Sequence, residues 1–185
     1  MRDRPNDHTH RLLDLFCGAG GAAMGYYRAG FTDIVGVDIN PQPHYPFAFI
    51  QADAMTFSFD GFDLIHASPP CQAYSTLRVM KNARKHPDLV VLVRSRLQQS
   101  RTHWLIENVP GAPLHNPLLL CGSFFDLTAQ NFQLRRHRLF ECSFPVSLSF
   151  RCQHRSPTLG IYGDKVRDIA KEKRQVFLSE TQYGL

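Results

Sequence analysis

A cysteine that follows one predicted strand and a glutamate at the end of another are the residues of this chain best suited to chemistry. Cys71 lies in the run Ser68-Pro69-Pro70-Cys71-Gln72, and Glu107 begins the run Glu107-Asn108-Val109. The two prolines fix the backbone and aim the thiol. A thiolate can add to an electron-poor ring while a carboxylic acid holds and protonates a ring nitrogen. The pair therefore predicts covalent catalysis on a nitrogen heterocycle.

These two residues must be positioned by the elements that precede them. Apolar runs and turn residues predict strands and two helices, one ending near Ala29 before Gly30 and one starting after Pro87, with Asp88 in its first turn, and running to about Arg101. The predicted strands cover residues 11–17, 33–39, 47–51, 62–67, 104–107, 118–121 and 138–142. Such alternation indicates an α/β fold, a doubly wound, mostly parallel, Rossmann-like sheet. Because strand ends carry the site in this arrangement, Cys71 and Glu107 should meet at one edge.

The length of 185 residues suits a single domain with a real core. We predict a disordered tail over residues 1–10, a catalytic domain over 11–142 and a short C-terminal region over 143–185. Within the last, residues 151–163 indicate a loop and 164–175 a short basic helix. Residues 73–87 indicate a long loop with one helical turn.

A glycine turn follows the first strand. Residues 18–23 contain the pattern Gly-x-Gly-x-x-Ala, and Asp38 ends the next strand about twenty residues further on, as nucleotide-binding units require. The pattern does not separate NAD from S-adenosylmethionine. Phe16 would pack against an adenine or simply belong to the core. Asp53, after the third strand, would accept a hydrogen bond from an adenine amino group or cap an exposed turn.

The composition restricts the compartment and the partners. The five cysteines are odd in number and irregularly spaced, which favours reduced thiols over a disulfide framework. Cys17, Cys121 and Cys142 lie in or beside apolar strands and are interpreted as core residues. No run is long enough to cross a membrane and the first nine residues lack a signal-peptide core, so we predict a cytoplasmic protein. The net charge of +5 favours an anionic partner, with nucleic acid the leading candidate.

Two basic runs and a Cys-x-His pair each allow both a functional and a purely structural interpretation. In residues 134–138, Arg136 and Arg138 alternate onto one face and would reach the site, or the run is a solvated strand entry. Residues 78–86 would contact phosphates or lie in solvent. Cys152-x-His154 resembles half of a metal site. No second pair is apparent, since Cys142 is distant and His137 lies in a basic run, so we predict no metal.

Together, and in this order, these pieces resemble the DNA (cytosine-5) methyltransferase family, most closely its compact phage and prophage members. The matching segments are Asp-Leu-Phe-Cys-Gly-Ala-Gly-Gly (14–21), Val-Gly-Val-Asp (35–38), Ala-Ser-Pro-Pro-Cys-Gln-Ala-Tyr-Ser (67–75), Glu-Asn-Val (107–109) and Arg-His-Arg-Leu-Phe (136–140). The resemblance implies transfer of a methyl group from S-adenosylmethionine to carbon 5 of a flipped-out cytosine in double-stranded DNA. It implies four catalytic residues: Cys71 as nucleophile, Glu107 as the acid at N3, and Arg136 and Arg138 as supports.

The same resemblance assigns the two binding surfaces. The cofactor pocket would be lined by Phe16, Gly18, Gly20, Asp38, Asp53 and Pro70. The nucleic-acid contacts would come from Gln72, Ser75, Arg78, Lys81 and Lys85.

The chain departs from the family pattern in two places. Leu134 occupies the position of the glutamine that usually precedes the two arginines, and Gln133 lies one residue away. The family's closing segment, which packs beside the glycine turn, is absent from these residues. A homodimer or a partner chain would complete the cofactor pocket, and residues 143–185 would supply at most a rudimentary target-recognition segment.

Other interpretations remain open at this point. An RNA cytosine-5 methyltransferase acting on tRNA would use the same residues. A catalytically impaired relative that binds the donor or DNA would retain the motifs. An NAD-dependent oxidoreductase would explain the glycine turn but not the Cys71 and Glu107 pair.

Overall fold

The computed structural model describes residues 10–74, 88–129, 131–148, 151–158, 161–162 and 165–166. These residues divide into two compact units. The first contains the described residues up to Leu119 together with Arg138–Leu148; the second contains Leu120–His137 and the described residues from Arg151 onward. The division does not coincide with the predicted boundary at residue 142, because Leu120–His137 leaves the first unit before the chain returns to it.

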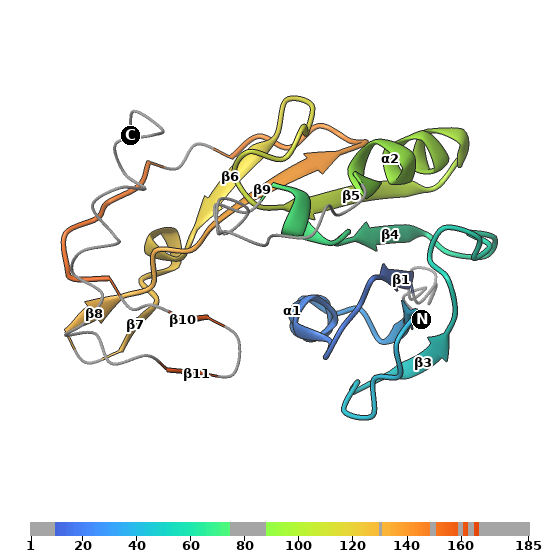
Figure 1. The fold of residues 1–185 in the computed structure, drawn as a ribbon, viewed down its shortest axis with the longest axis horizontal. Helices are drawn as coiled ribbons and strands as arrows, with labels where there is room; N and C mark the ends of the chain where they lie inside the picture. Colours follow the sequence, from blue (N-terminus) through green and yellow to red (C-terminus); the bar gives the residue numbers. More distant parts are fainter. Residues whose placement is uncertain are drawn as a thin grey trace, which may run out of the picture. The chain divides into compact units, whose positions relative to one another are not determined.

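A seven-stranded sheet in the order β3-β2-β1-β4-β5-β9-β6 organises the chain (Figure 1). Neighbouring strands from β3 to β5 pair in parallel, and β9 pairs antiparallel to β5. The strands are β1 (Arg11–Leu15), β2 (Asp33–Asp38), β3 (Ala48–Gln51), β4 (Leu64–Ala67), β5 (His103–Asn108), β6 (Leu118–Cys121) and β9 (His137–Cys142). The predicted α/β sheet is confirmed, and all seven predicted strands are present within two or three residues of the predicted ends.

Apolar side chains bury both faces of the sheet, as the doubly wound arrangement requires. Because successive strand residues point to opposite faces, Leu12 packs with Ala23 of helix α1 (Gly21–Arg28), whereas Leu13 packs with Leu97 of helix α2 (Leu89–Gln99). The two helices therefore cover opposite faces of the sheet.

The boundaries of α1 follow from its glycines. Gly20 adopts a left-handed conformation (φ 84°) as N-cap, and a Cβ there would collide with Pro46. Gly30, with φ 106°, follows the C-cap Ala29, which is the conformation that stops a helix without the penalty a side chain would bring. Both positions thus require glycine, and the predicted helix end is confirmed.

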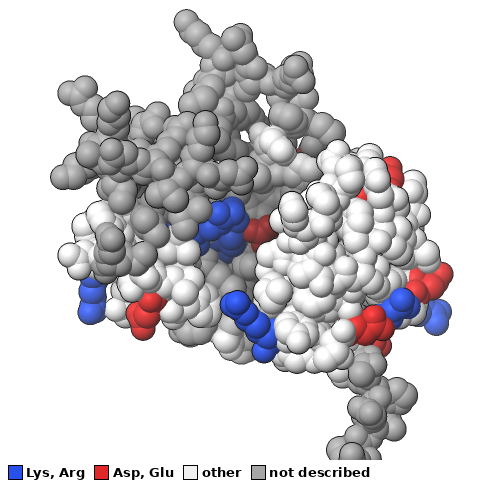
Figure 2. Space-filling model, turned by 90° about the horizontal axis from the view of Figure 1, so that it is seen from below, with Lys and Arg blue, Asp and Glu red and all other residues white. Residues whose placement is uncertain are grey.

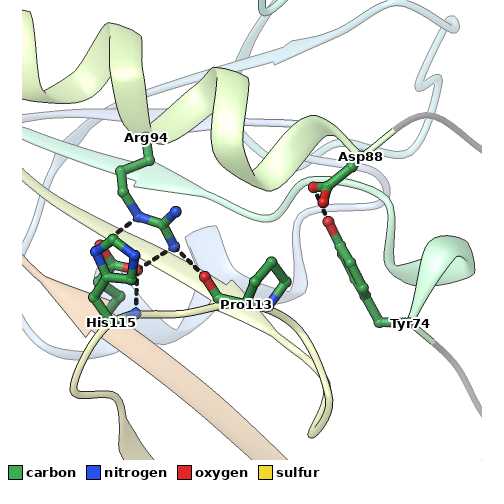
Figure 3. Close-up of polar contacts among 6 residues, drawn as sticks. Tyr74, Asp88, Arg94, Pro113 and His115 are labelled. Carbon is green, nitrogen blue, oxygen red and sulfur yellow. Dashed lines mark hydrogen bonds and ion pairs between the residues drawn. The ribbon is translucent and has the colours of Figure 1, made fainter.

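A buried ion pair fixes α2 to the antiparallel strand. Arg94 donates from Nε and Nη2 to the two carboxylate oxygens of Glu141, both at 2.7 Å (Figure 3). Nη2 also donates to the Pro113 carbonyl, and the His115 backbone N–H donates to Glu141. Both side chains are about 5 % exposed, so the charges depend on each other rather than on water. On the other side of the helix, Arg96 donates to the carbonyls of Ala54 and Phe57.

The second unit is built from very short elements. Its described strands β7 (Thr128–Ala129), β8 (Phe132–Gln133), β10 (Ile161–Tyr162) and β11 (Lys165–Val166) form two antiparallel pairs, and a 3-10 turn, η3, covers Gly122–Phe125. The predicted loop over 151–163 is therefore wrong at β10, and the predicted helix over 164–175 is wrong at β11. Two-residue pairings carry too little periodicity to be read from sequence.

Two further predictions reach residues that lie partly or wholly outside the described ranges. The tail over 1–10 is one; of the loop over 73–87 only its start is described. Within the described part of the chain, no helix combines the length and the apolar character needed to cross a membrane.

Candidate active site

Cys71 follows strand β4 and Glu107 lies near the end of the neighbouring parallel strand β5, and a hydrogen bond joins the two segments. β4 ends at Ala67 and β5 at Asn108, with Ala67 in register with Ile106. Nδ2 of Asn108, which is 1 % exposed, donates to the Pro69 carbonyl over 2.9 Å. The Asn108 side-chain oxygen accepts from the Val109 backbone N–H at 2.9 Å, so its amide is used at both ends. The Pro-Pro-Cys loop is thus held to the Glu-Asn-Val segment by a buried contact.

The backbone at Cys71 turns sharply. Pro70 (φ −47°, ψ 125°) precedes a 3-10 turn, η1 (Cys71–Ala73), which is closed by the Tyr74 backbone N–H donating to the Cys71 carbonyl. Cys71 is half-buried, so its thiol is neither a core group nor fully solvated. Proline fixes φ near this value, so the backbone that carries Cys71 has little conformational freedom.

Glu107 forms an ion pair with Arg138 of β9. Nε of Arg138 lies 2.6 Å from Oε1 of Glu107, and both side chains are between a fifth and a quarter exposed. The antiparallel register that pairs Glu107 with Phe140 brings β9 alongside β5 here. The apolar wall expected around Glu107 is therefore incomplete, because a charged guanidinium lies against its carboxylate.

The glycine turn is shaped by Asp38. The Gly18 backbone N–H donates to Oδ2 of Asp38 at 3.1 Å, and the Asn40 N–H donates to Oδ1 at 2.9 Å. Phe16 and Gly18 both have positive φ (58° and 48°), so the chain is tightly coiled where β1 ends. Positive φ is uncommon for a bulky residue and is a place to look for function.

This turn fits the cofactor that the sequence implies. A Cβ placed on Gly18 would meet nothing within 4 Å, which leaves open space against the backbone of the turn. The Asp38 oxygens retain lone pairs for a hydroxyl donor besides their backbone contacts. Asp53 lies past the end of β3, where its Oδ1 accepts from the Met55 N–H at 2.8 Å, so it also shapes an exposed turn.

A buried carboxyl group, Asp14, lies in β1, the strand that precedes the glycine turn. Asp14 is fully buried; Tyr45 donates to its Oδ2 at 3.2 Å, and Oδ1 has no hydrogen-bond partner. Burial raises the pKa of Asp14 to about 7, more than its hydrogen bonds lower it. Tyr45 fits only because Gly36 lacks a side chain, since a Cβ there would overlap the tyrosine ring.

The sequence analysis missed a histidine beneath the cysteine loop. Nδ1 of His66 lies 3.0 Å from the Tyr26 hydroxyl, and Nε2 lies 2.6 Å from the Ser68 hydroxyl. Burial lowers the pKa of His66 to about 4, so the ring is neutral. The only sequence signal was its place in β4 between apolar residues, which is ambiguous.

The remaining predicted residues are either exposed or outside the described ranges. Gln72 is exposed in η1. Arg136 is exposed and belongs to the second unit. Ser75, Arg78, Lys81 and Lys85 lie outside the described residues; the Tyr74 hydroxyl donates to Asp88 at the two ends of that stretch (Figure 3). On the face drawn in Figure 2, the described Lys and Arg side chains occur in several separate places rather than in one tract.

The second unit brings together residues for which the sequence analysis predicted no function. One ligand atom from each of Cys121, His137, Cys152 and His154 lies within 4.8 Å of the others. The Cys-x-His pair was a signal for half of this cluster. The other half was hidden because its members end β6 and begin β9.

Comparison with a solved structure identifies the fold. A protein described as a DNA modification methyltransferase encoded within an Escherichia coli prophage superposes with a TM-score of 0.53 at 20 % identity, covering 71 % of this chain and 45 % of that one. The fold is that of the S-adenosylmethionine-dependent methyltransferases, and fold and family together indicate S-adenosylmethionine as the cofactor.

Comparison of sequences identifies the family. Residues 10–119, more than half of the chain, match the model of the C-5 cytosine-specific DNA methylases, and the chain belongs to this family. It is also 35 % identical to Type II methyltransferase M1.HphI of Haemophilus parahaemolyticus, over 34 % of this chain and 21 % of that protein. The chain thus spans less than half the length of the proteins it matches here.

Proposed function

We propose that this protein methylates carbon 5 of cytosine in DNA through a covalent intermediate with Cys71. One observation carries the proposal: the buried Asn108 side chain joins the Pro69 carbonyl to the segment containing Glu107, so a nucleophile loop and an acid are held at one sheet edge. Family membership supports DNA cytosine as the substrate.

Each step assigns a task to a residue of this chain. The Cys71 thiolate adds to C6 of the cytosine, and Glu107 gives a proton to N3, which makes C5 an enamine-like nucleophile. When bound, S-adenosylmethionine would supply an electrophilic methyl group. C5 forms its bond to that methyl carbon as the carbon–sulfur bond breaks, and the departing sulfur keeps the electrons of the broken bond. A base then removes the C5 proton, Cys71 leaves with the electrons of its bond to C6, and the N3 proton returns to Glu107. The base must leave the duplex stack first, at a cost of a few kcal/mol.

The ion pair between Arg138 and Glu107 defines the state of the site before cytosine binds. Before cytosine arrives, Nε of Arg138 is paired with Oε1 of Glu107 at 2.6 Å. Proton transfer to N3 therefore requires the ring to displace or share Arg138. Removing the arginine should leave the Glu107 carboxyl poorly oriented, which makes Arg138 a positioning residue in this proposal.

Trapping with a fluorinated base tests the covalent step. DNA duplexes containing 5-fluorocytosine, incubated with the full chain and S-adenosylmethionine, should give an adduct stable in denaturing gels, because fluorine cannot leave as a proton does. Cys71→Ser should give none. Cys17→Ser is the matched control, because Cys17 is a buried cysteine of the same unit; an adduct that persists in Cys71→Ser, or maps to Cys17, would refute the assignment.

The nucleic-acid substrate is tested by transfer of a labelled methyl group. We expect incorporation into unmethylated duplex DNA and none into tRNA transcripts. Incorporation into tRNA alone would favour the RNA alternative. Failure with both substrates, alongside measurable donor binding, would favour an impaired binding protein.

A further inference from the structure

We propose that the second unit binds one Zn²⁺ ion through Cys121, His137, Cys152 and His154. The four side chains come from three separate stretches of the unit: the end of β6, the start of β9 and the segment 151–158. Their potential ligand atoms lie within 4.8 Å of one another. This proposal is independent of the methyl transfer proposed for the first unit.

Two of the distances match a tetrahedral zinc site. Sγ of Cys121 lies 3.6 Å from Nε2 of His154, and Nε2 of His137 lies 3.3 Å from Sγ of Cys152. With Zn–S bonds near 2.3 Å and Zn–N bonds near 2.0–2.1 Å, a regular tetrahedron separates S and N by about 3.6 Å. The remaining separations between ligand atoms reach no further than 4.8 Å.

The ligand set itself selects the metal. Two thiolates and two imidazoles without a carboxylate are the donors of structural zinc sites, whereas Mg²⁺ and Ca²⁺ take oxygen ligands. Four protein ligands leave no open position for water, which indicates a structural rather than a catalytic ion. The Ser123 hydroxyl donates to Sγ of Cys121 at 3.2 Å, an outer contact of the kind that orients a thiolate ligand.

The unit has little else to hold it together. Its described strands have two residues each apart from the ends of β6 and β9, and Cys121 is its one fully buried apolar side chain among those described. The segment 151–158 is attached by the Gln133 N–H donating to the Pro157 carbonyl at 2.8 Å and by Arg135 donating to the Ser156 carbonyl at 2.5 Å. Small units without a sufficient core are commonly stabilised by a metal or a disulfide.

A disulfide between Cys121 and Cys152 is the competing use of these thiols. All five cysteines are free in the structure. A disulfide would explain why the two cysteines are close but not why His137 and His154 lie beside them, whereas a zinc ion would bind all four side chains.

Metal analysis of the full chain tests the proposal. Protein purified under reducing conditions without chelators should contain about one zinc per chain by mass spectrometry, and X-ray absorption at the zinc edge should give two sulfur and two nitrogen neighbours. This measurement on the unaltered chain does not depend on whether variants fold. A reduced chain that takes up no zinc in competition with a chromophoric chelator, or one in which Cys121 and Cys152 form a disulfide, would overturn the proposal.

Variants locate the ligands. Cys152→Ser and His154→Asn should each lower zinc affinity by at least about a hundredfold. Cobalt replacement should show the visible bands of a tetrahedral thiolate site, and their sulfur charge-transfer intensity should fall by about half in Cys152→Ser. Cys142→Ser is the matched control, a half-buried cysteine of the first unit, and should retain the full metal content. Equal loss in Cys142→Ser and Cys152→Ser would contradict this ligand set.

Discussion

The two units of this protein obtain their order from different sources. In the first, the four parallel strands β1, β2, β4 and β5 carry buried leucines, valines and isoleucines on both faces, under two helices. In the second, the described strands other than the ends of β6 and β9 are two residues long, and two cysteine and two histidine side chains converge. Apolar burial grows with the size of an element, so it cannot supply the second unit with what it gives the first. A few strong, directional bonds serve a small unit better.

This difference determines whether a mutation at each site affects catalysis or the stability of the fold. The candidate active site stands on rigid strands, and its Asn108 contact is one of many that hold the edge. The Cys and His cluster is itself the centre of its unit. Damage at the first site should therefore affect chemistry more than folding, and damage at the second should affect folding first.

Removing the metal gives the largest expected difference between the units. On treatment with a strong chelator, backbone amides in residues 120–137 and 151–158 should lose hydrogen-exchange protection, because structural zinc contributes about 10 kcal/mol or more in small domains. Amides of β1 and β4 should keep theirs. Equal loss in both units, or none in either, would remove the distinction drawn between them.

Breaking the buried ion pair should produce the largest effect inside the first unit. Arg94→Met leaves Glu141 as an unpaired buried carboxylate, and we expect a loss of about 3–5 kcal/mol in unfolding free energy by denaturant titration. Asp33→Asn is the control, since the Arg11–Asp33 pair is nearly half exposed and should cost no more than about 1 kcal/mol.

A double replacement sharpens this result. Arg94→Met combined with Glu141→Leu removes both charges, so much of the lost stability should return. If the double variant is as unstable as Arg94→Met alone, the loss comes from packing rather than from the unpaired charge.

The pH dependence of the first unit should show a smaller effect from Asp14. Its folded pKa of about 7 lies above the ordinary value of 3.8, so the folded state binds the proton more tightly. Its contribution is full below pH 4 and is lost as pH rises to 7, by up to about 4 kcal/mol. Asp14→Asn, which keeps an acceptor for Tyr45, should abolish this fall when thermal unfolding is compared at pH 5 and pH 8.

His66 acts in the opposite direction and must be separated from Asp14. Its pKa is lowered from 6.5 to about 4, so its contribution is lost as pH falls through that window. The difference between the wild type and Asp14→Asn cancels the histidine, since His66 is present in both. If that difference does not change with pH, the Asp14 carboxyl is ordinary.

The sequence was sufficient where one local pattern determined an element. Gly30 marked the end of α1, and apolar runs bounded by turn residues identified all seven sheet strands. The rule that sites lie at strand ends predicted that the segments carrying Cys71 and Glu107 are neighbours, and the Asn108–Pro69 hydrogen bond joins those segments. These features depend on neighbours in the chain or on the parallel topology alone.

It was insufficient where distant residues meet by side-chain geometry. Glu107 was expected in an apolar pocket, but antiparallel β9 places Arg138 against it. His137 was set aside as part of a basic run, although its adjacent arginine points the other way on the same strand. Cys121 and His154 are far apart in sequence and no spacing rule joins them.

The position of β9 has a further consequence for how such a protein can change. The chain leaves the sheet through β6 and re-enters through β9, and these two strands are neighbours in the sheet order. Whatever lies between them is therefore inserted between adjacent strands, and inserts of that kind can be lengthened, shortened or exchanged without rethreading the host. Residues 122–136, which lie between the two strands, are a modular cassette in this sense. Replacing them with a short turn should leave the order of the seven strands unchanged, a route by which one methyltransferase scaffold could acquire new peripheral parts.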